Sequence, residues 1–115
     1  MVNQVILVGR LTQDPTVEET ENGHKRTVVN VAVNRGFKNV DGIYETDFIR
    51  CILWNGVAEN TSTYCHKGDV IGVKGRLQTS SYEKDGETKY AMDVIAEKVT
   101  FLSSKKIETI EEEAA

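Results

Sequence analysis

Aromatic and basic side chains alternate along one short segment of this sequence, with types and spacing that suit contact with nucleic-acid bases. Phe48, Arg50 and Trp54 fall on even positions between residues 45 and 54. Successive side chains of a β-strand point to opposite faces, so these three are expected to share one face. Aromatic rings stack on bases of any sequence, and a cation beside them can neutralise a phosphate. The alternative is that the two rings pack under a loop or in a subunit interface.

Three further segments combine basic residues with an aromatic ring or with a polar strand face. One is a predicted strand, one follows a predicted strand into a loop, and one forms the two arms of a turn at residues 85–86. They carry Lys74 and Arg76, then Arg35, Phe37 and Lys38, and then Tyr82, Lys84, Lys89 and Tyr90. Charges on hairpins often only keep a surface hydrated, but the four segments together predict an electrostatic groove with stacking platforms.

No pattern in the chain predicts catalysis, a metal site or a cofactor. The two histidines, His24 and His66, stand without the Cys-x-x-Cys or His-x-x-x-His spacing of a metal site. Neither a Gly-x-Ser-x-Gly segment nor a Gly-Lys-Thr phosphate loop is present. Carboxylates such as Asp47 and Glu59 have no evident acid–base partner, so we expect a binding protein and not an enzyme.

The distribution of charge keeps a nucleic-acid partner open despite a net charge of −4. Residues 1–105 hold 13 basic and 14 acidic side chains, and the remaining deficit lies in the acidic residues 106–115. A nearly neutral body can still carry a basic stripe. With 115 residues, the chain has room for one domain and one modest core.

The sequence also suggests where the protein resides. It holds no apolar run of about 18 residues and no pattern of a signal peptide at its start, so we expect no membrane contact. A cytoplasmic, nucleoid-associated location is the expectation, and Cys51 and Cys65 are then expected to be free thiols.

Most of the chain has a period of two, which predicts β-strands separated by turn dipeptides. One segment, residues 57–65, instead spaces Val57, Thr61 and Tyr64 as on a helix. The predicted strands lie at about 4–11, 27–34, 45–54, 70–78 and 89–102. Five antiparallel strands with one helix between the third and fourth favour an all-β OB-fold, a five-stranded Greek-key barrel. A plain five-stranded sheet with a helix on one face is the alternative.

Residues 1–102 closely resemble the bacterial and phage single-stranded DNA-binding protein family. The order and spacing of the matching pieces together make this resemblance specific. The pieces are residues 3–11, Asp14-Pro15, residues 32–37, Asp47-Phe48-Ile49, Trp54, Ala58-Glu59-Asn60, Tyr64, Lys67-Gly68 and residues 73–82.

The resemblance implies an OB-fold that binds single-stranded DNA without sequence preference, coating strands during replication, recombination and repair. It implies base-stacking roles for Phe37, Phe48, Trp54 and Tyr82. The matching basic positions are Arg35, Lys38, Arg50, Lys67, Lys74 and Arg76, to which the hairpin adds Lys84 and Lys89. Gly56, Gln78 and Ser80 stand where some relatives carry basic residues. An OB-fold module that mainly binds proteins, such as a primosome-type subunit, is the alternative.

We expect residues 1–104 to form the DNA-binding domain and residues 105–115 a short, acidic, disordered tail. Family members typically end in an acidic tip with proline and phenylalanine that docks replication and repair proteins, and this tip is absent here. Ile6 and Val8 lie opposite Val5 and Leu7 on the first strand, so both faces of that strand are apolar. An exposed apolar strand requires a cover. Together with the resemblance, this predicts a homotetramer.

Overall fold

The computed structural model describes residues 1–102, which form six strands and one helix. The predicted tail, residues 105–115, lies outside the described residues. The five predicted strands and the helix are confirmed, with two long hairpins that extend past the predicted ends, and a two-residue strand is added. The elements are β1 (Val5–Leu11), β2 (Glu18–Glu19), β3 (Lys25–Lys38), β4 (Tyr44–Trp54), α1 (Asn55–Tyr64), β5 (Val70–Lys84) and β6 (Glu87–Phe101).

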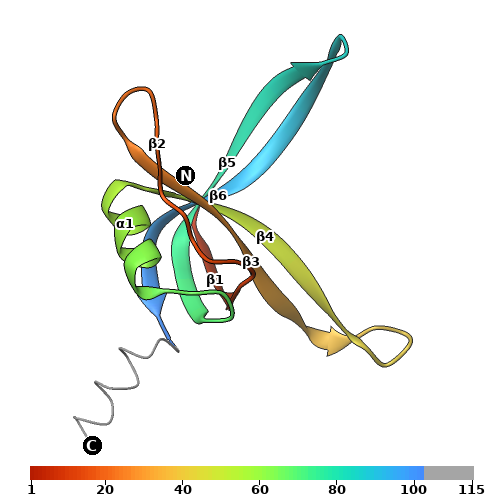
Figure 1. Cartoon of the computed structure of the whole chain (residues 1–115). Helices are drawn as coiled ribbons and strands as arrows, with labels where there is room; N and C mark the ends of the chain where they lie inside the picture. The colour runs from red at the N-terminus through yellow and green to blue at the C-terminus, as the bar shows by residue number, and fades with distance from the viewer. Residues whose placement is uncertain (103–115) are drawn as a thin grey trace, which may run out of the picture.

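The strands close into a barrel, as predicted for an OB-fold, and do not form an open sheet. Neighbouring strands follow the order β1-β5-β6-β4-β3-β2, and a further pairing joins β1 to β3. At that closure Arg10 lies opposite Ala32 and Leu11 opposite Val31. Figure 1 shows α1 beside the barrel, between β4 and β5 along the chain.

The expectation of five antiparallel strands is wrong at one pairing. β4 runs parallel to β6, with Cys51 opposite Val94 and Leu53 opposite Ala96. The reason is geometric: in a closed ring of five strands, directions cannot alternate all the way around. One neighbouring pair must therefore be parallel. The four remaining pairs of the ring are antiparallel.

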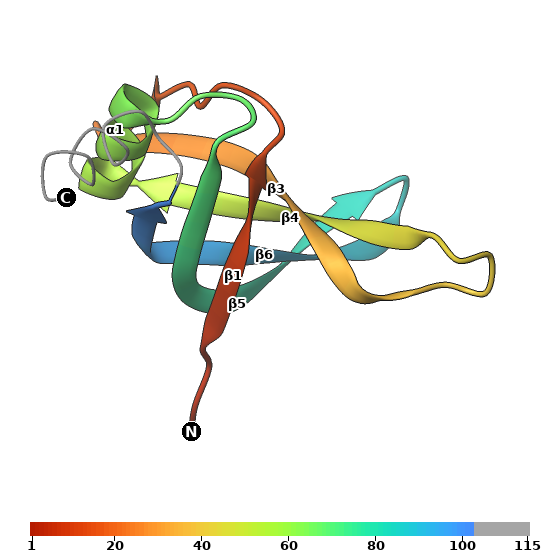
Figure 2. The same cartoon turned by 90° about the horizontal axis from the view of Figure 1, so that it is seen from below.

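Two hairpins project from the barrel and diverge from each other (Figures 1 and 2). The outer halves of β3 and β4 form one hairpin, and those of β5 and β6 form the other. Asp85 and Gly86 both have positive φ, which the two-residue turn between β5 and β6 requires. Gly42 has the same property at the end of the other hairpin. We call these projections the β3–β4 arm and the β5–β6 arm.

The hydrophobic core fills the barrel from the inward positions of the strands. Cys51 and Leu53 of β4 are fully buried, as the alternation predicts, and Ile49 is half-buried and packs against the core. α1 contributes buried Ala58 and Thr61 at one side of this core. Burial raises the pKa of the Cys51 and Cys65 thiols to about 11, and both cysteines are free, as expected.

Two glycines allow the strands to come close enough for the barrel to close. A Cβ at Gly9 would overlap the carbonyl oxygen of Ala32, and a Cβ at Gly75 would overlap that of Ile95. Gly75 also lies where the register between β5 and β6 shifts by one residue. A glycine at such an irregularity marks a tight bend or a close approach of two backbones.

We predict that Gly75→Ala lowers the free energy of unfolding by about 1–3 kcal/mol or more, because the added methyl group must displace backbone. Gly36→Ala is the matched control, since its Cβ would meet nothing within 4 Å. Urea denaturation followed by circular dichroism measures both variants. Equal midpoints for the two variants would show that the close approach at Gly75 carries no structural cost.

Candidate nucleic-acid interface

The predicted aromatic face of β4 lies on the outside of the barrel. Phe48 is 69% exposed and Trp54 is 37% exposed. Arg50, between them, is also exposed. Ile52 shares this face by parity but is only 8% exposed, because Val28 of β3 and Ile95 of β6 flank it as paired neighbours. The face therefore combines a small apolar centre with two rings at its ends.

Arg26, which the sequence reasoning did not select, lies against Trp54. The two residues are cross-strand partners on β3 and β4, and the guanidinium carbon lies 5.7 Å from the centre of the indole ring. This distance is within the range of a cation–π contact. The predicted strand began at residue 27, so Arg26 was left outside it. Its even position, in step with Val28, was the available signal.

The β3–β4 arm carries an exposed phenylalanine and a paired arginine. Phe37 is exposed, and the ammonium group of Lys38 lies 5.6 Å from the centre of the Tyr44 ring. Arg35 donates to both carboxylate oxygens of Asp47, at 2.9–3.3 Å, and to Glu45. The hydrogen bonds from Arg35 hold the pKa of the Asp47 carboxyl below its ordinary value.

Two more of the predicted cations are already paired with carboxylates. Nε of Arg50 lies 3.3 Å from Oδ1 of Asp93, whose side chain is only 16% exposed. Nζ of Lys89 lies 3.0 Å from Glu87. By contrast, five of the predicted cations have no carboxylate oxygen within 4.0 Å in residues 1–102. These are Lys38, Lys67, Lys74, Arg76 and Lys84.

The structure divides the predicted site residues among several places. Tyr82 and Lys89 are cross-strand partners on the β5–β6 arm, with Lys84 near its turn. Arg76 of β5 lies opposite Ile95 of β6, which in turn lies opposite Ile52 of β4. Arg76 is therefore next to the outer face of β4. The arms and this face surround one side of the barrel.

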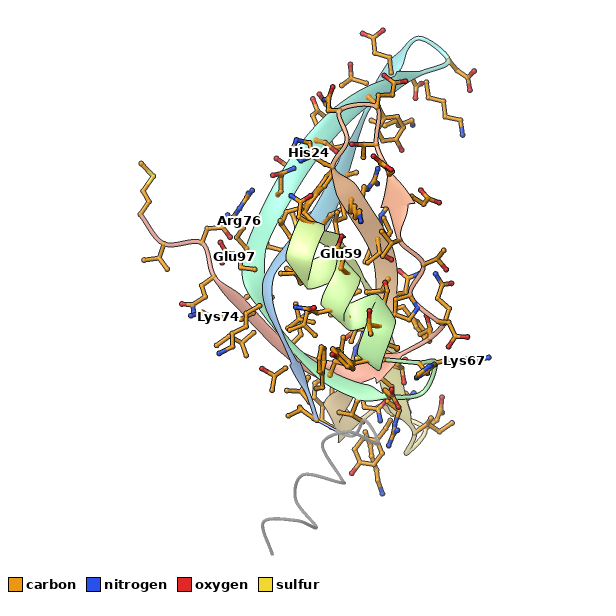
Figure 3. All side chains as sticks on the ribbon, turned by 60° about the vertical axis from the view of Figure 1, so that its left-hand side comes forward. His24, Glu59, Lys67, Lys74, Arg76 and Glu97 are labelled. Carbon is orange, nitrogen blue, oxygen red and sulfur yellow. The ribbon has the colours of Figure 1, made fainter. Side chains whose placement is uncertain are left out.

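Lys74 is two residues from Arg76 on β5, on the same outer face of that strand, whereas Lys67 lies outside the strands. Lys74 lies opposite Ile6 on β1 and opposite Lys98 on β6, and lines a shallow groove with these two residues. Lys67 lies in the turn after α1, across the helix from Lys74 and Arg76 (Figure 3). The single groove that the sequence predicts over these residues stays a prediction. Arg26 is a further candidate for it, beside Trp54.

Comparisons with known proteins agree with this geometry. The model of the family described as "Single-strand binding protein family" matches residues 2–102. The chain is 49% identical to "Single-stranded DNA-binding protein B" of Bacillus subtilis, over 91% of this chain and 94% of that protein. It is 48% identical to the "Single-stranded DNA-binding protein" of Oceanobacillus iheyensis and 49% identical to that of Bacillus cereus. The match covers 91% of this chain in both cases, and 66% and 62% of those longer relatives.

The described residues, 1–102, contain neither a membrane-spanning helix nor a cluster of metal ligands. Between residues 1 and 102, no helix is long and apolar enough to cross a membrane. In the same part of the chain, no three histidine, cysteine, aspartate or glutamate side chains gather as metal ligands.

We predict that the Asp47 carboxyl titrates below its ordinary pKa of 3.8, because protonation breaks its hydrogen bonds with Arg35. Because the pKa of Asp47 is lower in the folded protein, its ionised carboxylate stabilises the fold at pH values above the ordinary pKa. This stabilisation is lost as the pH falls through the pKa of the folded protein. Titration of the side-chain carboxyl by NMR measures the pKa. Arg35→Gln should return it to the ordinary range, whereas Arg50→Gln should leave it low. An equal effect of the two substitutions would contradict the assignment of the shift to Arg35.

Proposed function

The chain belongs to the single-strand binding protein family, and from this membership together with the outer face of the barrel we propose that it binds single-stranded DNA without sequence preference, coating exposed strands during replication, recombination and repair. The observation that carries this proposal is the pair of exposed rings, Phe48 and Trp54, on one strand between two projecting arms. Exposed aromatic rings in a row are costly on a surface that binds nothing. The protein binds stoichiometrically and does not act as an enzyme.

The proposed binding combines two kinds of contact, base stacking on aromatic rings and neutralisation of phosphates by cations. Bases stack on Phe48 and Trp54, and the arms add the exposed rings of Phe37 and Tyr82. Stacking contributes about 1–3 kcal/mol per base and tolerates any base, which gives binding without sequence preference. Smaller rings at three of these four positions, in place of tryptophan, leave less stacking area per base.

The cations of the interface act in two groups. Arg76, Lys38 and Lys84 can meet a phosphate directly, because no described carboxylate holds them. Arg35, Arg50 and Lys89 must first exchange a carboxylate for a phosphate. The exchange gives less net free energy than a new contact, since one charge-assisted interaction replaces another. Exposed ion pairs are weak, so the exchange remains accessible.

A protein-binding OB module is the other candidate, and the same rings distinguish the two functions. A module of that kind would use an apolar patch of a partner to cover Phe48 and Trp54, and would need no cations on the arms. The nearly neutral charge of residues 1–105 still leaves Lys38, Lys84 and Arg76 available around the rings. This distribution favours a polyanionic ligand.

We predict that oligo(dT) quenches Trp54 fluorescence and binds with strong salt dependence. Each single-strand phosphate that is neutralised adds about −0.7 to the slope of log K against log salt, so three contacts give about −2. Duplex DNA of equal length should bind much more weakly, because its bases are already stacked. A slope near zero would contradict the proposal.

The same experiment separates a stacking role of Trp54 from a packing role. Trp54→Ala should cost about 1–3 kcal/mol of binding free energy, measured by anisotropy of a labelled oligonucleotide, and little stability. Trp54→Phe keeps a ring and serves as the control. Loss of about 3–5 kcal/mol of stability with unchanged affinity would instead place Trp54 in the core.

We further propose that the protein assembles into a homotetramer through the outer face of β1, and that it acts on DNA in the cytoplasm. Ile6 is 70% exposed and Val8 is also exposed, and both line the shallow groove that contains Lys74 and Lys98. A twofold contact between copies is the simplest way to cover such a strand. An assembly would let one strand contact several interfaces and so gain avidity.

We predict a tetramer in light scattering at micromolar concentration, four times the 12.8 kDa of one chain. Ile6→Lys should reduce the mass, because it places a desolvated charge in the contact. Val40→Lys is the matched control, since Val40 is fully exposed at the end of the β3–β4 arm. A monomeric wild type would refute the assembly. A dimer would keep the β1 contact but reject the further contact between dimers that a tetramer needs.

A further inference from the structure

We propose that Arg26 and Trp54 form one nucleotide subsite, in which Trp54 stacks on a base and Arg26 binds the neighbouring phosphate. This inference rests on the proposed function and extends it to a residue that neither the motif nor the family match selects. It also gives the DNA a path past Trp54 toward β2, beyond the two arms.

The position of Arg26 is fixed by its neighbours. It lies opposite Trp54 on β4 and opposite Glu18 on β2, so it is held between two strands. Its Nε is buried and has no hydrogen-bond partner. The guanidinium carbon lies 5.7 Å from the centre of the indole ring, within the range of a cation–π contact. A side chain held in this way loses little further entropy when it binds a ligand.

The donors of Arg26 are unused in the described part of the chain. A guanidinium group carries five N–H donors, and residues 1–102 offer Arg26 no hydrogen bond or ion pair. The other arginines near the rings differ, since Arg35 is held by Asp47 and Arg50 by Asp93. Arg26 can therefore bind a phosphate without first releasing a carboxylate, and its planar fork suits that anion.

A small cavity lies beside Arg26 on the side of β2. It has a volume of about 410 Å³ and is lined by Gln13, Thr16, Glu18, Arg26 and Val28. The amide of Gln13 and the hydroxyl of Thr16 can donate to a phosphate oxygen, and Val28 gives the cavity an apolar side. Glu18 repels an anion, but its carboxylate forms no ion pair with Arg26. We therefore expect the phosphate between Arg26 and the loop that carries Gln13 and Thr16.

The adjacent lysine provides an internal contrast. Lys25 is one residue away on β3, so its side chain points to the other face of the strand. Its Nζ lies 2.7 Å from Glu59 of α1, a residue labelled in Figure 3. Two cations next to each other in sequence thus differ in environment: one is paired with a helix, and the other is unpaired beside the aromatic face.

The test compares Arg26→Gln with Lys25→Gln in the binding of labelled oligo(dT) across a salt series. Arg26→Gln should make the slope shallower by about 0.7 and weaken affinity about five- to tenfold near 50 mM salt. Lys25→Gln should leave the slope unchanged. Arg26→Lys keeps the charge and should retain the slope that Arg26→Gln loses. A role limited to packing on Trp54 would leave the slope unchanged in both variants.

A second pair of variants tests the cavity without altering the cation. Glu18→Gln should strengthen binding, because it removes the one carboxylate of the lining, whereas Glu19→Gln on the other face of β2 should not. If Arg26→Gln does not fold, the two glutamate variants still test whether the subsite binds a phosphate.

The outcomes separate this inference from the proposed function. Equal effects of Arg26→Gln and Lys25→Gln, or of the two glutamate variants, would overturn the subsite. So would a wild-type slope in Arg26→Gln, and in that case a loss of affinity in Trp54→Ala would leave the proposed function standing. A wild-type protein that fails to bind oligo(dT) would overturn both.

Discussion

The barrel closes where the end of β1 meets the middle of β3, and the rest of the molecule depends on that closure. Arg10 and Leu11 pair with Ala32 and Val31, and Gly9 allows the two backbones to approach beside Ala32. Closure buries one face of each of the five barrel strands in a single core, which a chain of this size needs for stability. It pairs only Arg10 and Leu11 of β1 with β3, so the edge of β1 before Arg10 stays unpaired on that side. The opposite faces of the strands then remain available for binding.

Closure also accounts for the shape of the binding surface. Five strands in a ring require one parallel pair, and this pair, β4 with β6, places Ile52 beside Ile95 at the centre of the aromatic face. β3 to β6 are much longer than β1, so their outer halves leave the barrel as the two arms. The rings of the face and of the arms are thus positioned by one scaffold, although they come from distant parts of the sequence.

The cations of this surface differ in whether a carboxylate already pairs with them. A protein with a net charge of −4 can attract a polyanion only where its cations are gathered and unpaired. Asp47, Glu45 and Asp93 hold Arg35 and Arg50 in the absence of a ligand, which limits local repulsion between like charges. In the proposed mode of binding, Lys38, Lys84, Arg76 and Arg26 make the first contacts with DNA phosphates. The carboxylates therefore determine the net free energy that each arginine would contribute on binding a phosphate.

The features that follow from local backbone geometry were predictable from the order of residues alone. Alternation places Phe48 outside and Leu53 inside because successive side chains of a strand point to opposite faces. Asp85-Gly86 specifies a tight hairpin because both residues accept positive φ. The strand order around a helix indicated the barrel, and the family pattern agreed with it.

Contacts between residues far apart in the sequence became apparent only in the folded protein. Arg26 lies on Trp54, Asp93 holds Arg50, and Lys67 lies across α1 from Lys74 and Arg76. Ile52 is buried on an outer face because its cross-strand neighbours are apolar, and the parallel pair exists because the ring has an odd number of strands. Parity fixes the face of a residue, but its partners depend on strand register and on closure. Both are set by contacts between segments that are far apart in the sequence, and no local pattern encodes them.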